Sequence, residues 1–137
     1  MGRAMPVEPQ SAPAVATLYE RVGGSPFFEA LVDRFYAGVD TDPVLRPMYP
    51  EDLTASRRHL ALFLSQYFGG PPVYGQQRGH PRLRMRHAPF AIATAERDAW
   101  LRHMRAAVES SGAPGDAIEE MLRYFQMAAN SLLNRLG

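Results

Sequence analysis

Four histidines are the side chains of this sequence best able to ligate a metal or to carry a proton near neutral pH: His59, His80, His87 and His103. No two of them stand in an H-x-x-x-H or H-E-x-x-H pattern, so their spacing does not indicate a zinc site. The sequence has no cysteine, which excludes disulfides, thiolate metal sites and iron–sulfur clusters. It also lacks the G-x-S-x-G, P-loop and G-x-G-x-x-G motifs, and its acidic residues are scattered. Nucleophilic hydrolases, nucleotide-binding enzymes and paired-carboxylate hydrolases are therefore unsupported.

The most unusual stretch covers residues 80–90, where three arginines alternate with apolar residues directly before His87. By residue type alone, this stretch reads as a solvated basic face or as an anion site, since arginine forks match carboxylates and phosphates. Nucleic-acid binding is the weakest of the three alternatives, because a net charge of +1 provides no global attraction to polyanions. His87 taken alone is typical of a structural histidine, and Tyr36, Tyr49 and Trp100 are typical of core aromatic residues.

These residues must be positioned by helices, because apolar residues recur at helical spacing and no segment alternates like a strand. The sequence predicts one all-α domain over residues 15–137, preceded by a disordered tail over residues 1–14 that is rich in Pro and Ala. Ser25 and Thr94 are suited to cap helices. The polar stretch 70–80 is expected to be irregular, which in small helical domains often marks a bound ligand. The predicted helices cover residues 16–22, 26–39, 43–48, 54–68, 81–87, 95–109 and 114–136.

The two long early helices and the two long late helices are expected to pack as two crossed pairs. No apolar run is long enough to span a bilayer, and the N-terminus shows no secretory signal. We therefore expect a cytoplasmic protein that binds neither membrane nor nucleic acid.

Several motifs occur in one order along the chain. The longest is QRGHPRLRMRHAPF at residues 77–90, and the others are RFY at 34–36, MYPED at 48–52, QYFGG at 66–70, ERDAWL at 96–101 and MAA at 127–129. This collinear set closely resembles the group II truncated haemoglobins, and the resemblance extends over residues 17–133. It implies a truncated globin, which is a two-over-two helical sandwich around haem b. The haem is expected to be non-covalent, since no C-x-x-C-H motif is present.

The resemblance implies that His87 is the proximal ligand of the haem iron. Its second ring nitrogen is then expected to donate to a backbone carbonyl or a similar acceptor, which orients the ring. We expect Arg82 and Arg86 to pair with the haem propionates, while His59 occupies a position where related chains often carry arginine. The other residues close enough in sequence to contribute are Tyr74 and His80.

On the distal face, the resemblance assigns Tyr36, Tyr49 and Trp100 as hydrogen-bond donors to a diatomic ligand. Ser56 lies near the position of the distal histidine in larger globins, and its small side chain is expected to leave the entrance open. Leu60, one turn later, is expected to press on the haem face. The remaining apolar lining is expected to comprise Phe35, Phe63, Leu64, Met85, Phe90, Ile92, Met104 and Phe125.

Two functions are compatible with such a site. The first is reversible binding or transport of O2 and of other diatomic ligands such as NO and CO. The alternative is a redox enzyme that oxidises nitric oxide to nitrate or turns over peroxide. The enzyme needs an external reductase, because the sequence contains no flavin or nicotinamide motif. Assembly as a homo-oligomer is left open.

Overall fold

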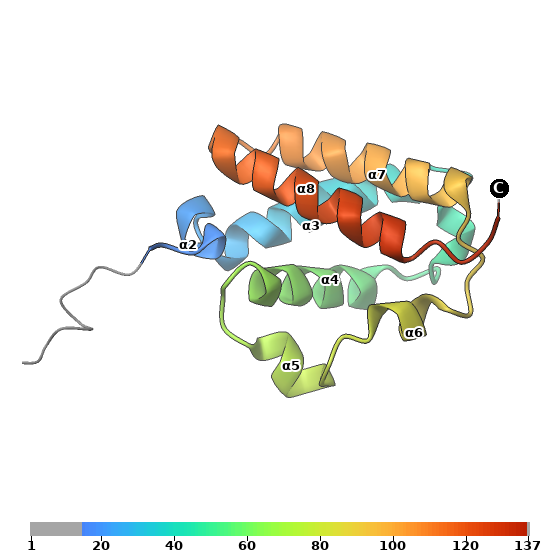
Figure 1. Cartoon of the computed structure of the whole chain (residues 1–137), viewed down its shortest axis with the longest axis horizontal. Helices are drawn as coiled ribbons and strands as arrows, with labels where there is room; N and C mark the ends of the chain where they lie inside the picture. The colour runs from blue at the N-terminus through green and yellow to red at the C-terminus, as the bar shows by residue number, and fades with distance from the viewer. Residues whose placement is uncertain (1–14, 137) are drawn as a thin grey trace, which may run out of the picture.

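The computed structural model describes residues 15–136, so the tail predicted at residues 1–14 lies outside the described residues. Every regular element in this range is a helix (Figure 1), which confirms the all-α prediction. None of the helices in residues 15–136 is both long and apolar enough to cross a bilayer. The elements are α2 (Leu18–Val22), α3 (Ser25–Asp40), the 3-10 turn η1 (Arg46–Met48), α4 (Thr54–Tyr67), α5 (Val73–Arg78), α6 (Leu83–His87), α7 (Thr94–Glu109) and α8 (Gly115–Ser131).

The four long helices form two pairs, as the sequence predicts. Helix α3 packs against α4, α7 packs against α8, and α3 also contacts α7, which joins the pairs. In Figure 1, α7 and α8 form one layer, α3 lies behind α8, and α4 lies below them. The short helices α5 and α6 lie beneath α4, at the edge opposite α7 and α8. The short helices are thus the outermost elements on the α4 side of the molecule.

Helix α3 is central because it presents large apolar side chains on successive turns. Phe28, Leu31, Phe35 and Val39 are completely buried, at the spacing that places residues on one helix face. Burial of each side chain of this size contributes roughly 1.5–3 kcal/mol. Phe35 meets the ring of Trp100 on α7 edge-on, with centroids 5.3 Å apart. The packing that stabilises the core therefore also positions Trp100.

Two helix starts differ from the prediction. Ser25 is already the first residue of α3, and its hydroxyl pairs with the Tyr19 hydroxyl at 2.9 Å instead of capping the helix. Thr94 is likewise the first residue of α7, where the Glu96 carboxylate accepts from the backbone N–H of Ala93 at 2.8 Å. The Ser25 hydroxyl is thus engaged by Tyr19, and the start of α7 is stabilised by the carboxylate of its third residue.

The polar stretch after α4 is more regular than predicted, since α5 occupies part of it. The side-chain oxygen of Gln66 accepts from the N–H of Gly75 at 2.8 Å, and the buried Tyr74 ring meets Phe63 edge-on with centroids 5.5 Å apart. Six residues are too few to show a helical period, so tertiary contacts define this helix. Gly69, which precedes it, has a φ of 105°, a left-handed conformation that glycine adopts without strain.

Helix α6 is short and weakly held. None of its residues is buried, and it begins after Arg82, whose φ of 49° costs a non-glycine residue about 1–2 kcal/mol. The C-terminal segment supports the loop after α6: Asn134 donates to the carbonyl of Phe90 at 2.9 Å and accepts from the N–H of Ile92 at 2.8 Å. Helix α8 ends at Ser131, earlier than predicted, because the following residues leave the helix to bind this loop.

Candidate functional site

A cavity of about 330 Å³ is bounded by residues from every helix between α3 and α8. This volume lies within the range of protein pockets that hold small ligands and cofactors. Most of the wall is aliphatic or aromatic, and the polar groups are gathered at a few points of it. Three of these points carry the chemistry of the site: a histidine, a group of hydroxyl and indole donors, and a basic corner.

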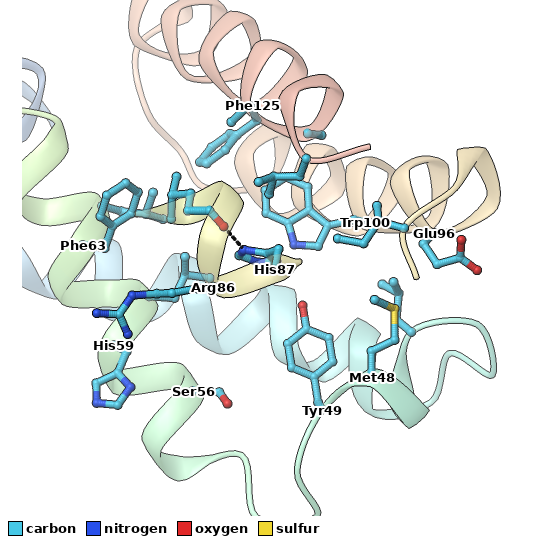
Figure 2. A pocket seen from close by; sticks show the side chains of 18 of the residues that line it. Met48, Tyr49, Ser56, His59, Phe63, Arg86, His87, Glu96, Trp100 and Phe125 are labelled. Carbon is cyan, nitrogen blue, oxygen red and sulfur yellow. Dashed lines mark hydrogen bonds between the residues drawn. The ribbon is translucent and has the colours of Figure 1, made fainter. Parts of the chain in front are cut away.

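His87 projects into the cavity from α6 (Figure 2). Its Nδ1 lies 2.7 Å from the carbonyl oxygen of Leu83, one turn earlier. A carbonyl can only accept, so Nδ1 carries the proton and donates, and the neutral ring then has a free lone pair on Nε2. This is the tautomer that a metal-ligating histidine requires, and the same hydrogen bond orients the ring.

Three hydrogen-bond donors meet on another side of the cavity. Tyr36 of α3 and Tyr49, which follows η1, have edge-on rings with centroids 5.6 Å apart. In Figure 2 the Tyr49 hydroxyl points toward the indole of Trp100, and His87 lies near the same opening. Trp100 packs against Phe125 of α8 with ring centroids 5.7 Å apart. Tyr36 and Trp100 are therefore carried by helices that belong to the packed core, and Tyr49 is positioned against them.

Both tyrosines retain their protons throughout the physiological pH range. Burial raises the pKa of Tyr49 to about 12, against a smaller opposing effect of the Trp100 indole N–H. Burial also raises the pKa of Tyr36 well above its usual value; Tyr49 adds to this rise and the Ser56 hydroxyl opposes it. Phenols that do not ionise act here as hydrogen-bonding groups and do not transfer protons near pH 7.

The third polar region is a basic corner. The guanidinium of Arg78 donates to Nε2 of His59 at 3.1 Å and lies 5.9 Å from the ring centre of Tyr74. Burial, followed by the charges of Arg78, Arg58 and Arg86, lowers the pKa of His59, so this histidine is neutral at pH 7. Within the described range, the buried Nε of Arg78 has no hydrogen-bond partner. An unpaired buried donor among arginines is suited to an anion that the protein itself does not supply.

Most of the residues predicted from sequence do line the cavity: Tyr36, Tyr49, Ser56, His59, Leu60, Phe63, Leu64, Tyr74, Arg86, His87, Ile92, Trp100 and Phe125.

Six predicted residues lie outside the cavity wall. Phe35 and Met104 are completely buried within the core, so they support the wall from behind rather than forming it. Met85 and Phe90 are 58% and 41% exposed, because α6 and the loop after it have few neighbours to bury them. The two polar residues predicted to contribute but found exposed outside the wall are His80 and Arg82.

Other wall residues were not predicted from sequence. Arg78 lies within the motif at 77–90, but α5 was not foreseen, and without that helix nothing showed where its side chain points. Tyr124 precedes Phe125 on α8 and packs on Tyr67 with ring centroids 4.0 Å apart; burial raises its pKa to about 12. The remaining members are Leu45, Met48, Leu83, Glu96, Arg97, Ala128, Ala129 and Leu132.

The wall fits the haem that the sequence resemblance implies. Nε2 of His87 is the ring nitrogen not engaged by Leu83 and is placed to bind iron, and the rest of the wall is an apolar surround for a macrocycle. The orphaned Nε of Arg78 provides a buried donor for a carboxylate. Three independent features of the cavity therefore agree with one cofactor.

Known proteins share this fold and much of this sequence. The sequence profile of the family described as bacterial-like globin matches residues 17–134. The group 2 truncated haemoglobin YjbI of Bacillus subtilis is 40% identical over 117 residues, which cover 85% of this chain and 88% of that protein. The solved haemoglobin of the thermophilic phototrophic bacterium Chloroflexus aurantiacus is 53% identical with a TM-score of 0.87, and the match covers 88% of this chain and 100% of that chain. The group II truncated haemoglobin of Bacillus anthracis is 38% identical with a TM-score of 0.88, over 91% of this chain and 96% of that chain.

Proposed function

The chain belongs to the bacterial-like globin family, among its group II truncated haemoglobins, and on that premise we propose that His87 ligates the iron of its oxygen-binding haem. The observation that carries this proposal is the 2.7 Å hydrogen bond from Nδ1 of His87 to the carbonyl of Leu83, which leaves Nε2 free at the cavity wall. The group is haem b held without a covalent bond, since the sequence has no cysteine to attach it.

Bound haem supplies an iron atom with one coordination position open to O2 or another diatomic gas. Tyr36, Tyr49 and Trp100 are the donors that face such a ligand, and the two tyrosines keep their protons because burial raises the pKa of each. One hydrogen bond to a ligand that carries negative charge contributes about 1–3 kcal/mol. Two such bonds slow ligand escape by roughly 100-fold or more. The function is therefore tight, reversible O2 binding rather than bulk transport, which requires fast release.

The basic corner holds the haem carboxylates. Arg78 takes the role that sequence assigned to Arg82, because Arg78 lines the cavity with an unpaired buried Nε whereas Arg82 is exposed outside the wall. Arg86 lines the cavity too, and its guanidinium is held by the carbonyls of Pro81 at 2.7 Å and of Arg78 at 3.4 Å. His59 accepts from Arg78 and keeps that side chain turned to the cavity.

The test is the absorption spectrum of the purified protein in the ferric state, after reduction and after exposure to air. We expect a strong Soret band and a lasting oxygenated form. His87→Ala should lose haem or weaken its binding by at least about 100-fold, with recovery on addition of imidazole. His80→Ala is the matched control. Because His80 is exposed and lies outside the cavity wall, its replacement should leave the spectrum unchanged. Haem binding by His87→Ala with an unaltered spectrum would show that another residue ligates the iron.

A redox enzyme acting on peroxide is the second candidate, and one observation favours it. Tyr124 lines the cavity, and its ring centroid lies 4.0 Å from that of Tyr67, which is 49% exposed. Two oxidisable rings therefore connect the cavity to the surface. Peroxide added to the haem-loaded protein should then produce dityrosine fluorescence. This signal should disappear in Tyr67→Phe and persist in Tyr74→Phe. Equal dityrosine yield from the parent protein and from Tyr67→Phe would remove the support for this candidate.

A further inference from the structure

Positive charge is concentrated in one continuous stretch of the chain. Residues 53–95 contain six arginines and no Asp or Glu, which gives this stretch a net charge of +6. The other residues contain nine arginines and 14 acidic residues, which gives them a net charge of −5. The overall charge of +1 therefore conceals two strongly and oppositely charged parts. We call the positive part the arginine face; its members are Arg57, Arg58, Arg78, Arg82, Arg84 and Arg86.

The arginine face lacks the ion pairs seen elsewhere in residues 15–136. Arg21, Arg46, Arg97, Arg102 and Arg105 each have a carboxylate within 3.4 Å. No member of the arginine face has such a partner in the same described range, and five of the six are exposed. The sixth, Arg78, is partly buried at the cavity wall. The charge of this face is therefore left unneutralised by the protein.

The fold brings three of these arginines to the basic corner of the cavity. The six arginines lie on or beside α4, α5 and α6, which form the edge of the molecule opposite α7 and α8 (Figure 1). Arg58, Arg78 and Arg86 come close enough to His59 for their charges to lower its pKa. The hydrogen bond from Arg58 to the Gln77 side chain, at 2.9 Å, joins α4 to α5 in the same place. Arginines from three separate helices thus converge where the haem carboxylates are proposed to lie.

The cofactor does not account for all of this charge. Haem has two carboxylates, so at most two of the six arginines are neutralised by it. The other members retain a net positive charge on this side of the cavity, and at physiological salt this charge acts over about 8–10 Å. Such a patch speeds the approach of a protein that bears a complementary acidic patch.

We propose that the arginine face is the docking surface for an acidic electron-donor protein, placed beside the cavity that would hold the haem. This inference rests on the proposed function, since it takes the haem to lie in the cavity. In the step that the docking serves, one electron leaves the reduced iron–sulfur or flavin centre of the partner, and the ferric iron at His87 gains it. A compact protein fits this surface better than a duplex or a bilayer, because an extended polyanion would also face the net charge of −5 on the other residues.

The test uses the full haem-loaded chain in its ferric form and an acidic plant-type [2Fe–2S] ferredoxin as the probe. Binding is followed by calorimetry at about 20 mM and about 300 mM salt, conditions between which the screening length falls several-fold. We expect binding at low salt that weakens at least about tenfold at high salt. Stopped-flow mixing with reduced ferredoxin should show reduction of the iron at a rate with the same salt dependence.

Arg57→Glu with Arg84→Glu tests the surface without touching the cavity wall, which contains neither residue. Both side chains are exposed, one on α4 and the other on α6, so the variant should fold. Arg105→Glu with Arg123→Glu on α7 and α8 is the control, since it changes the net charge equally away from the arginine face. The first variant should weaken ferredoxin binding and slow reduction by about tenfold or more, and the control by less than about twofold.

Four results would overturn the proposal: no binding, binding independent of salt, equal losses in the two variants, or binding without reduction of the iron. Tighter salt-dependent binding to duplex DNA or to vesicles of anionic phospholipid than to ferredoxin would also overturn it. The Soret band of each sample separates this failure from that of the proposed function. A sample with a normal haem spectrum that fails to bind ferredoxin refutes the docking surface alone, whereas a chain that never takes up haem refutes both.

Discussion

The two sides of the cavity are held in different ways. The donor side stands on α3 and α7, where Tyr36 is only 4% exposed and Phe35 is completely buried against Trp100. The histidine side stands on α6, which has no buried residue and starts at a strained left-handed Arg82. The contrast indicates that the donors are preorganised by the core, while the proposed iron ligand depends on a few hydrogen bonds and on the cofactor itself.

The largest expected effect concerns the donor side. Tyr36→Phe with Trp100→Phe removes two donors from a wall whose packing preserves its shape, so we expect the O2 dissociation rate to rise by about 100-fold. Stopped-flow measurement of O2 release checks this, with Tyr67→Phe at the surface as the control. A dissociation rate within about twofold of the parent would mean that these side chains do not hold the ligand.

A second variant tests how rigid the α3–α7 contact is. Replacing glycine by alanine within a helix usually stabilises it by about 1 kcal/mol, but a Cβ at Gly38 would overlap the ring of His103 on α7. We expect Gly38→Ala to lower the free energy of unfolding by about 1–3 kcal/mol. Gly115→Ala is the control, because a Cβ there meets no atom within 4 Å. If denaturant unfolding gives the same free energy of unfolding for Gly38→Ala and the parent, the α3–α7 contact can adjust to the added methyl group and is less rigid than its packing indicates.

A third variant weakens the histidine side alone. Asn134→Ala removes the hydrogen bonds to Phe90 and Ile92 that support the loop after α6. We expect amide exchange in residues 83–92 to accelerate by about tenfold, while α3 and α7 keep their protection, because the two sides open separately. Asn130→Ala on α8 removes side-chain contacts of similar type and should leave these amides unchanged. Uniform acceleration in Asn134→Ala would show that the two sides unfold as one unit.

The smallest expected effect is a loss of stability in acid that depends on Asp42, which follows α3. The buried Asp42 carboxylate accepts from Nε2 of His103 at 2.6 Å, from the N–H of Val44 and Leu45, and from Arg102 at 3.1 Å. The hydrogen bond from His103 contributes most to holding the pKa of Asp42 at about 2, below its ordinary value of 3.8.

A lowered pKa in the folded state stabilises the fold above the unfolded-state pKa, and this contribution is lost as pH falls through the folded-state pKa. The free energy of unfolding should therefore decline between about pH 4 and pH 2. Asp42→Asn should show a shallower decline over that range. Parallel curves for the two proteins would show that other carboxylates dominate the acid response.

The sequence predicted the long helices better than the short ones, for a physical reason. The apolar residues Phe28, Leu31, Phe35 and Val39 repeat at helical spacing over several turns. Only a helix places all four side chains on one face that can be buried. Helix α5 has only six residues, and it was not predicted because the contacts that define it come from Gln66 and Phe63 on another helix. The same omission hid Arg78, so only Arg82 and Arg86 were predicted to pair with the haem propionates; Arg86 does line the cavity.

By itself, the sequence determined the all-α class, the two pairs of long helices and the set of aromatic and histidine residues from which the site is built. These features follow from residue type and from periodicity, which are local properties. Only the tertiary structure decided that Arg78 lies in the cavity wall, that Met85 and Phe90 lie on the surface, and that Asn134 supports the loop after α6. The direction of a side chain on a short helix is set by whatever packs against it, and those partners lie far away in the sequence.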